Sequence, residues 1–419
     1  MKQLLVLGAG LVSPPLIRYF LPRRDVRVAV ASLDFSRIEP LVARHSDQIR
    51  LVPADINDET AVRRLMRESD AVVSLLPAPL LPAISRMAVE ERRHLVSTSY
   101  TTDAVRALDA EARAAGVLLL NEIGFDPGID HMTAMRLIER IQRSAGVVTA
   151  LRSAAAGLPA PEADTNPWRY KFSWNPHGVL TAARASARYL RDGNVVEVRA
   201  AELLQHTFID EVEGIGRLEI YPNRDSLAYR DSYGLHSARN LFRGTMRWPG
   251  WMETIDAAAR LGWLDTNARE WPPGTTYRDV SSTHPLAAAV EERLRWAGFF
   301  SDEPIGRDTA APLDIFVARL EQVLRYEPGE RDMAVLQHRF EVSYGDGRQE
   351  TIVSGVTAFG EPHGDTAMSR LVGLPAAIAA NLILEGGVRL EGVCIPTLRE
   401  VYEPVLDALA EEGIEADER

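Results

Sequence analysis

The sequence has almost no cysteine: Cys394 is the only one among 419 residues. A single cysteine excludes an internal disulfide and a metal cluster built on cysteines. The nine histidines are scattered without a His-x-x-x-His pair, and no Gly-x-Ser-x-Gly turn supports a serine nucleophile. We therefore expect a protein that carries no metal and does not use serine-hydrolase chemistry.

Long apolar runs and a surplus of basic residues are also lacking. The best membrane-span candidate, residues 371–384, is too short and contains Pro375 and Asn381. The apolar N-terminus is short for a secretory signal and has no small-residue cleavage site. A formal charge of −12 and a pI of about 5.4 argue against a nucleic-acid partner. We expect a cytoplasmic enzyme that binds neither membranes nor nucleic acids.

Lysine is scarce as well, since it occurs only at Lys2 and Lys171 and every other basic residue is arginine. An internal lysine in such a chain can be needed for its compact ammonium or its adjustable pKa, which arginine cannot supply. Chance survival explains Lys171 equally well. Both interpretations stay open at this point.

The first 34 residues have the pattern of half a dinucleotide site. An apolar run at residues 2–10 carries Gly8 and Gly10, a helical stretch follows, and a second apolar run at 26–31 leads to Asp34. Such glycines let backbone N–H groups approach a pyrophosphate at a helix N-terminus. Ser13 replaces the third glycine of the fingerprint, which serves helix–strand packing. Asp34 can accept hydrogen bonds from a ribose and predicts NAD rather than NADP, because a 2′-phosphate would meet like charge.

The alternation of strand and helix patterns continues to about residue 122. We predict a Rossmann-like α/β fold with a doubly wound parallel sheet, whose ligand edge lies at the carboxyl ends of the strands. That edge would carry Ser74, residues 97–100 and residues 122–126. The predicted strands lie at residues 51–55, 71–76, 94–99 and 117–122, with helices at 59–68 and 103–115.

After residue 130 the pattern changes to a mainly β second domain with an inserted helical lobe. A helix is expected at 130–143, with Asp130 as its possible N-cap, and a hairpin is expected at 338–344 and 349–357. The C-terminal helix at 366–385 is apolar on most sides and should cover the nucleotide sheet. The predicted domains are nucleotide-binding (1–126 and 366–419), substrate-binding and dimerisation (127–248 and 332–365), and a helical lobe (249–331) with helices at 253–261, 285–297 and 314–325.

Three segments combine residues that could carry chemistry. Asp126 lies in an Asp-Pro-Gly turn at a predicted strand end, where it could orient a substrate ammonium or accept a proton; simple turn formation is equally plausible. Residues 157–176 surround Lys171 with aromatic residues and prolines, a pattern that buried aromatic packing also explains. Arg224, Arg243 and Arg247 could bind carboxylates bidentately, although most arginines in this chain should be surface residues.

Six ordered segments together resemble saccharopine reductase, the glutamate-forming saccharopine dehydrogenase. These segments lie at residues 8–12, 121–131, 157–162, 170–174, 221–226 and 242–250. The resemblance implies a homodimer in which glutamate and allysine (2-aminoadipate 6-semialdehyde) condense to an imine that a nicotinamide hydride reduces to saccharopine.

The resemblance also implies roles for individual residues. Asp126, Tyr100 and Lys171 would be catalytic: Asp126 and Tyr100 would position the bridging nitrogen and relay protons, and Lys171 would be a second polar anchor or an acid–base partner. Substrate contacts would come from Ser99, Tyr100, Asp126, Arg224, Gly244, Thr245 and Met246. Cofactor contacts would come from Gly8, Gly10, Leu11, Val12, Ser13, Pro14, Asp34, Asp55, Ile56, Leu76, Thr98, Ser99, Phe125, Asp126, Pro127 and Asn175.

Two departures from the family pattern bear on specificity. Members that use NADP have Cys-Arg-Thr where this chain has Ser32, Leu33 and Asp34, so the arginine expected at the 2′-phosphate is missing. Residues 153–157 lack the cysteine and tyrosine of the family, so acid–base help from that cysteine cannot operate. We therefore expect an NAD-preferring enzyme, with NADP disfavoured. The alternatives are a carboxynorspermidine-type imine reductase acting on a polyamine-like substrate and a catalytically silent dinucleotide-binding protein.

Overall fold

The structure is a computed structural model that describes residues 1–281 and 284–418. The chain forms two compact units, which are described separately. The first unit comprises Met1–Ala145 and Gly364–Asp417, and the second comprises Gly146–His363 together with Glu418.

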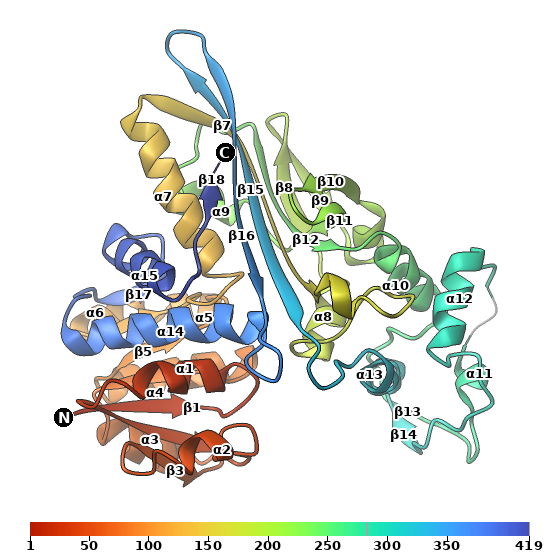
Figure 1. Ribbon diagram of the computed structural model, residues 1–419, viewed down its shortest axis with the longest axis horizontal. Coiled ribbons are helices and arrows are strands. Elements are labelled where there is room, and N and C mark those ends of the chain that lie inside the picture. The colour runs from red at the N-terminus through yellow and green to blue at the C-terminus, as the bar shows by residue number, and fades with distance from the viewer. Residues whose placement is uncertain (282–283, 419) are drawn as a thin grey trace. The chain divides into compact units, whose positions relative to one another are not determined.

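A parallel seven-stranded sheet forms the centre of the first unit (Figure 1). The strand order is β17-β6-β5-β4-β1-β2-β3. Successive strands are added on one side of β1 up to β3 and on the other side from β4 onward, and doubly wound folds bind ligands at this switch point between β1 and β4. Leu4, Leu5, Val6 and Leu7 of β1 are fully buried because this strand is central and covered on both faces. The strands are β1 (Lys2–Leu7), β2 (Val26–Ser32), β3 (Ile49–Pro53), β4 (Ala71–Ser74), β5 (His94–Ser97), β6 (Leu118–Leu120) and β17 (Gly392–Cys394).

Helices cover this sheet, and α14 (Ala367–Glu385), from the C-terminal part of the chain, packs beside α1 (Figure 1). Thr366 caps α14 by accepting a hydrogen bond from the Ser369 amide. This helix is long and apolar enough to cross a membrane by composition, but 72% of its apolar window is buried in the protein, as in a core helix. The helices are α1 (Ser13–Phe20), α2 (Glu39–Val42), α3 (Glu59–Arg67), η1 (Ala78–Leu80), α4 (Leu81–Glu90), α5 (Asp103–Arg106), α6 (Asp109–Ala115), α7 (Ile129–Arg143), α14 (Ala367–Glu385) and α15 (Arg399–Glu411).

The second unit is built on a mixed nine-stranded sheet. Its main path is β10-β11-β12-β7-β15-β16-β18, and β8 and β9 join beside β12. The long hairpin β15–β16 turns at Gly347, whose φ of 88° suits a residue without a Cβ. The strands are β7 (Gly146–Pro159), β8 (Ala187–Arg191), β9 (Asn194–Val198), β10 (Phe208–Val212), β11 (Gly216–Pro222), β12 (Asn240–Arg247), β15 (Asp332–Tyr344), β16 (Gln349–Phe359) and β18 (Asp417–Glu418).

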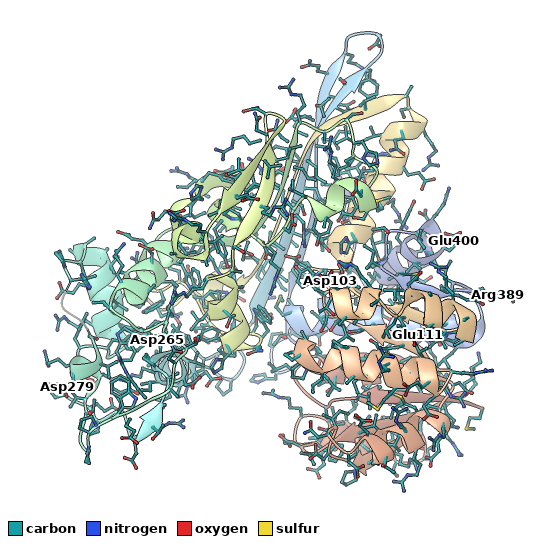
Figure 2. All side chains as sticks on the ribbon, turned by 180° about the vertical axis from the view of Figure 1, so that it is seen from behind. Asp103, Glu111, Asp265, Asp279, Arg389 and Glu400 are labelled. Carbon is teal, nitrogen blue, oxygen red and sulfur yellow. The ribbon has the colours of Figure 1, made fainter. Side chains whose placement is uncertain are left out.

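Helices with an aromatic core complete the second unit. Trp263, Phe299 and Phe316 are fully buried, and the ring centroids of Phe299 and Phe316 lie 4.6 Å apart. Asp279 is exposed and Asp265 is partly exposed beside this core (Figure 2). The remaining elements are η2 (Pro161–Ala163), α8 (Pro176–Ala182), η3 (Ala200–Gln205), α9 (Ala228–Ser232), α10 (Trp251–Arg260), β13 (Arg269–Glu270), α11 (Tyr277–Val280), α12 (Ala288–Trp296), β14 (Thr309–Ala310) and α13 (Pro312–Val323).

The predicted fold class is confirmed, with local corrections. Asp130 is not the N-cap of its helix: α7 begins at Ile129 after Gly128, and Asp130 Oδ1 accepts a hydrogen bond from the Gly128 amide at 2.6 Å. The predicted helix at 103–115 is two short helices, α5 and α6. Residues 127–145 group with the nucleotide unit because α7 packs against α15, and residues 249–331 fall within the second unit.

Candidate active site

The glycine turn after β1 has the open geometry that a pyrophosphate requires. Gly8 has a φ of 102°, and a Cβ at Gly10 would meet no heavy atom within 4 Å. Ser13 begins α1, and its hydroxyl donates to the Gly10 carbonyl at 2.7 Å, which closes the turn. No side chain caps α1. Residues 8–14 therefore fit the phosphates of a dinucleotide by backbone groups and free space.

Asp34 follows β2 but its carboxylate already has a local partner. Asp34 Oδ1 accepts a hydrogen bond from the Ser36 amide at 2.9 Å. This bond and the nearby Arg37 hold the pKa of the Asp34 carboxyl below its usual value. The side chain is exposed, so the ionised carboxylate stays hydrated and its charge is screened by solvent.

Tyr100 and Asp126 come together at the carboxyl edge of the parallel sheet. Tyr100 follows β5 and Asp126 follows β6, and the Tyr100 hydroxyl donates to Asp126 Oδ1 at 3.3 Å. Both side chains are partly accessible, as groups that meet a substrate must be. The sequence pattern predicted both residues at this edge, and the hydrogen bond joins them into one polar unit.

A tight turn at residues 124–128 places Asp126. The Gly124 amide donates to the Pro127 carbonyl at 3.0 Å, and the Asp126–Pro127 peptide is cis. Gly128 has a φ of 147°, and a Cβ there would lie 2.0 Å from the Gly124 carbonyl oxygen. Only glycine fits this position without moving the backbone.

Other predicted cofactor residues lie along the same edge. Leu76 follows β4, Thr98 and Ser99 follow β5, and the Ser99 amide is held at 3.2 Å by the Ser97 hydroxyl. Asp55 follows β3 and accepts hydrogen bonds from the Asn57 backbone and side chain at 2.9 Å. Asn175 belongs to the second unit, where it caps α8 by accepting from the Gly178 amide at 3.3 Å.

Lys171 lies buried in the second unit with its ammonium already paired. Its Nζ lies 2.6 and 2.5 Å from the two carboxylate oxygens of Glu330, and it also donates to the Thr165 hydroxyl at 3.1 Å. The ammonium beside Glu330 holds the pKa of that carboxyl below its ordinary value, although burial opposes this. These contacts tie the loop before α8 to the segment before β15 and favour an anchoring role for Lys171.

Arg224 and residues 244–246 are neighbours in the second unit. In the sheet register Pro222 of β11 pairs with Gly244 of β12, and the Asn223 amide donates to the Arg243 carbonyl at 2.9 Å. Arg224 is exposed and has a φ of 56°, a strained conformation for a residue with a side chain. Thr245 is partly accessible, whereas the Met246 side chain is buried in the core.

The two other candidate arginines are buried among aromatic rings. The Arg243 guanidinium bonds the Tyr229 hydroxyl and lies 4.3 Å from that ring's centroid. Arg247 lies 5.1 Å from the ring centroids of both Tyr170 and Trp251 and donates to the Met246 carbonyl at 2.8 Å. These contacts favour a packing role for both guanidinium groups.

Sequence reasoning missed several partners of the site, including Glu122, His131 and Glu330. Glu122 lay inside a recognised segment but received no role of its own, and Glu330 lies 159 residues from Lys171. No metal-binding group of three or more His, Cys, Asp or Glu residues occurs within residues 1–281 and 284–418.

Comparison with known families assigns the chain. The model of the saccharopine dehydrogenase NADP binding domain matches residues 4–120, and that of the saccharopine dehydrogenase C-terminal domain matches residues 124–414. The chain belongs to the saccharopine dehydrogenase family. The predicted family and the predicted oxidoreductase class are thereby confirmed.

Relatives match over the whole length of the chain. Saccharopine dehydrogenase [NADP(+), L-glutamate-forming] of Schizosaccharomyces pombe is 33% identical, with 100% of this chain and 99% of that protein covered. The solved structure of apo saccharopine dehydrogenase (L-Glu forming) from Saccharomyces cerevisiae matches with a TM-score of 0.87 at 33% identity, and the match covers 100% of this chain and 99% of that chain. Homospermidine synthase from Legionella pneumophila has a TM-score of 0.61 at 10% identity, covers 99% of this chain and 91% of its own, and shares the fold alone.

The predicted preference for NAD is wrong. The family model that matches the nucleotide unit is an NADP binding domain, and three fungal relatives at 33–34% identity are named as NADP(+) enzymes. The prediction relied on repulsion by Asp34. In the structure that carboxylate is exposed and engaged by the Ser36 amide, and solvent screens the charge of an exposed group. It is therefore a weak barrier to a 2′-phosphate.

Proposed function

We propose that the protein interconverts saccharopine with L-glutamate and allysine, using NADP(H). The observation that carries this proposal is the Tyr100–Asp126 pair at the carboxyl edge of the parallel sheet, in a chain that matches glutamate-forming enzymes end to end. An enzyme of this kind must hold a planar imine beside a nicotinamide and control a proton on the bridging nitrogen. A paired phenol and carboxylate at the ligand edge suit the second task.

Residues of the first unit would provide orientation and proton control. NADP(H), when bound at the glycine turn of residues 8–14, supplies or accepts the hydride. Asp126 would orient the bridging nitrogen and hold its proton through the carboxylate. The Tyr100 hydroxyl, 3.3 Å from Asp126 Oδ1, would pass protons between that carboxylate and water.

The carboxylates of the substrate require cationic or donor groups. Arg224 is the candidate clamp because it is exposed, strained and adjacent in register to residues 244–246. A guanidinium can bind a carboxylate with two parallel hydrogen bonds. Lys171 would support the site indirectly, since Glu330 already occupies its ammonium.

A continuous assay tests the activity. Purified protein, NADPH, glutamate and allysine should consume NADPH, whereas saccharopine and NADP+ should form it, both followed by absorbance at the nicotinamide band. The polyamine alternative makes the opposite prediction: turnover only with an imine derived from a diamine. Absence of turnover with glutamate and allysine, together with turnover of the diamine-derived imine, would overturn the proposal.

We also propose a homodimer working in the cytoplasm, on the basis of the family resemblance and the acidic, globular composition. Light scattering coupled to gel filtration should give a mass near twice the 46.3 kDa of the chain. A single-chain mass at micromolar concentration would contradict the dimer. Imaging of a tagged protein in its own cell would test the compartment.

A further inference from the structure

Glu122 has an unusual position, with hydrogen bonds to the residues on either side of Tyr100. It follows β6 on the same edge as Asp126, and its φ of 60° puts a side-chain residue in the left-handed region. Only 4% of its surface is exposed. A buried carboxylate on a strained backbone is costly and persists only when neighbouring groups hold it firmly.

Those neighbours lie on both sides of Tyr100. The Glu122 amide donates to the Ser99 carbonyl at 3.2 Å, and Glu122 Oε1 accepts a hydrogen bond from the Thr101 amide at 2.9 Å. One residue therefore binds the chain immediately before and immediately after Tyr100. This two-point contact fixes the backbone that carries the phenol.

The second carboxylate oxygen of Glu122 is also held. His131 on α7 is fully buried, and its Nε2 lies 2.9 Å from Glu122 Oε2. Burial opposes ionisation of Glu122, but the hydrogen bonds to His131 and from the Thr101 amide outweigh it and lower the pKa of the carboxyl. His131 and Asp126 belong to the same segment, residues 121–131, and the contacts of His131 and Glu122 lead to the backbone around Tyr100.

We infer that Glu122, held by His131, is a positioning residue that sets the Tyr100 hydroxyl against Asp126. This inference rests on the proposed function for its kinetic meaning. The contacts of Glu122 with the backbone of Ser99 and Thr101, called the Glu122 clamp below, can be tested without any substrate.

The structural arm of the test is hydrogen–deuterium exchange on the full chain. Glu122→Ala should speed exchange in residues 97–104 by about tenfold or more, because the Thr101 amide loses its acceptor. Glu122→Gln keeps an oxygen for that amide and should restore slow exchange. Gln48→Ala is the matched control, because buried Gln48 bonds three carbonyls in the same unit, those of Phe20, Arg23 and Val26, and its removal should leave residues 97–104 unchanged.

The kinetic arm uses a double-mutant cycle with Tyr100→Phe. A misplaced catalytic group costs roughly 10- to 100-fold in rate, so Glu122→Ala should lower kcat by that factor with an unchanged KM for NADPH. Because Glu122 acts through Tyr100, the double variant should be no slower than Tyr100→Phe alone. Gln48→Ala combined with Tyr100→Phe should give additive effects.

The outcomes separate the clamp from the proposed reaction. Unchanged exchange in Glu122→Ala, or additive kinetics with Tyr100→Phe, overturns the clamp. If the unaltered protein fails to turn over glutamate and allysine, the proposed function fails and exchange alone decides the clamp. Should Glu122→Ala not fold, His131→Asn is expected to speed exchange in the same residues by a smaller factor, and unchanged exchange there would overturn the inference.

Discussion

Replacing Lys171 distinguishes a structural anchor from an acid–base catalyst. Its side chain is 5% exposed and that of Glu330 is 21% exposed, and Nζ contacts both carboxylate oxygens. Removing one partner of a buried pair costs about 3–5 kcal/mol. Because the Glu330 side chain is partly exposed to solvent, Lys171→Met should reduce the free energy of unfolding by roughly 2–4 kcal/mol. For a unit of this size, that loss lowers the melting temperature by about 4–16 °C.

Thermal unfolding followed by circular dichroism would measure this loss. The matched control is Arg331→Ala, which breaks the exposed Arg331–Glu162 pair in the same unit and should cost at most about 1 kcal/mol. Lys171→Met/Glu330→Gln should recover part of the loss, since no unpaired carboxylate remains. A melting temperature unchanged in Lys171→Met, with kcat reduced by orders of magnitude, would refute the anchor and favour proton transfer by the ammonium.

The pH dependence of the same pair has a defined sign. Lys171 holds the pKa of Glu330 below its ordinary value of 4.5. The stability contributed by the ionised carboxylate is therefore complete above pH 4.5 and is lost as the pH falls through the lowered pKa of the folded state. The difference in melting temperature between Lys171→Met and the unaltered protein should shrink along that same acid limb.

Three further predictions concern the candidate site. Asp126→Asn should lower kcat by about 100-fold or more, because general acid–base groups contribute about 10²–10⁴-fold. Equal kcat values in stopped-flow assays would exclude the role. Arg224→Ala should lower kcat/KM for glutamate by about 10- to 150-fold, since a hydrogen bond to a charged group is worth about 1.5–3 kcal/mol, and an unchanged value would place Arg224 outside the site. Gly128→Ala should destabilise the first unit measurably in thermal melts, because its Cβ would lie 2.0 Å from the Gly124 carbonyl oxygen. The control is Gly345→Ala, whose Cβ would meet no heavy atom within 4 Å. Equal melting temperatures of the two variants would contradict the tight turn.

Six strands of the parallel sheet were predictable because each is a short apolar run bounded by turn residues, whereas the three-residue edge strand β17 was missed. The order β3-β2-β1-β4-β5-β6 follows from right-handed crossovers between consecutive strand–helix units, so topology alone placed Tyr100 and Asp126 on one edge. The hairpin of β15 and β16 was predictable for a different reason, since residues 345–347 carry turn chemistry between two β-rich runs. The start of β15 was missed by six residues, although residues 332–337 include an apolar run and pair with β7.

The partners of buried polar groups were not predictable, because nothing local in the chain indicates them. Lys171 stood out by composition, yet its role depends on Glu330, which a separate segment brings within 2.5 Å. Asp34 shows the opposite case, in which a local contact mattered. Its carboxylate accepts a hydrogen bond from the amide of Ser36, two residues away, and lies exposed, so solvent screens the repulsion on which the NAD prediction relied.

Asp34 also shows why a single charged position is poor evidence for cofactor choice. A carboxylate discriminates against a 2′-phosphate only if it is desolvated and aimed at the ribose, since water and salt screen exposed charges. The Ser36 amide and the nearby Arg37 favour the ionised form of Asp34, but the carboxylate is exposed, so water and salt weaken its effect on a phosphate. It follows that Asp34→Ala should change NADP+ affinity, measured by calorimetry, by less than about threefold; a much larger gain would show that the carboxylate does oppose the phosphate.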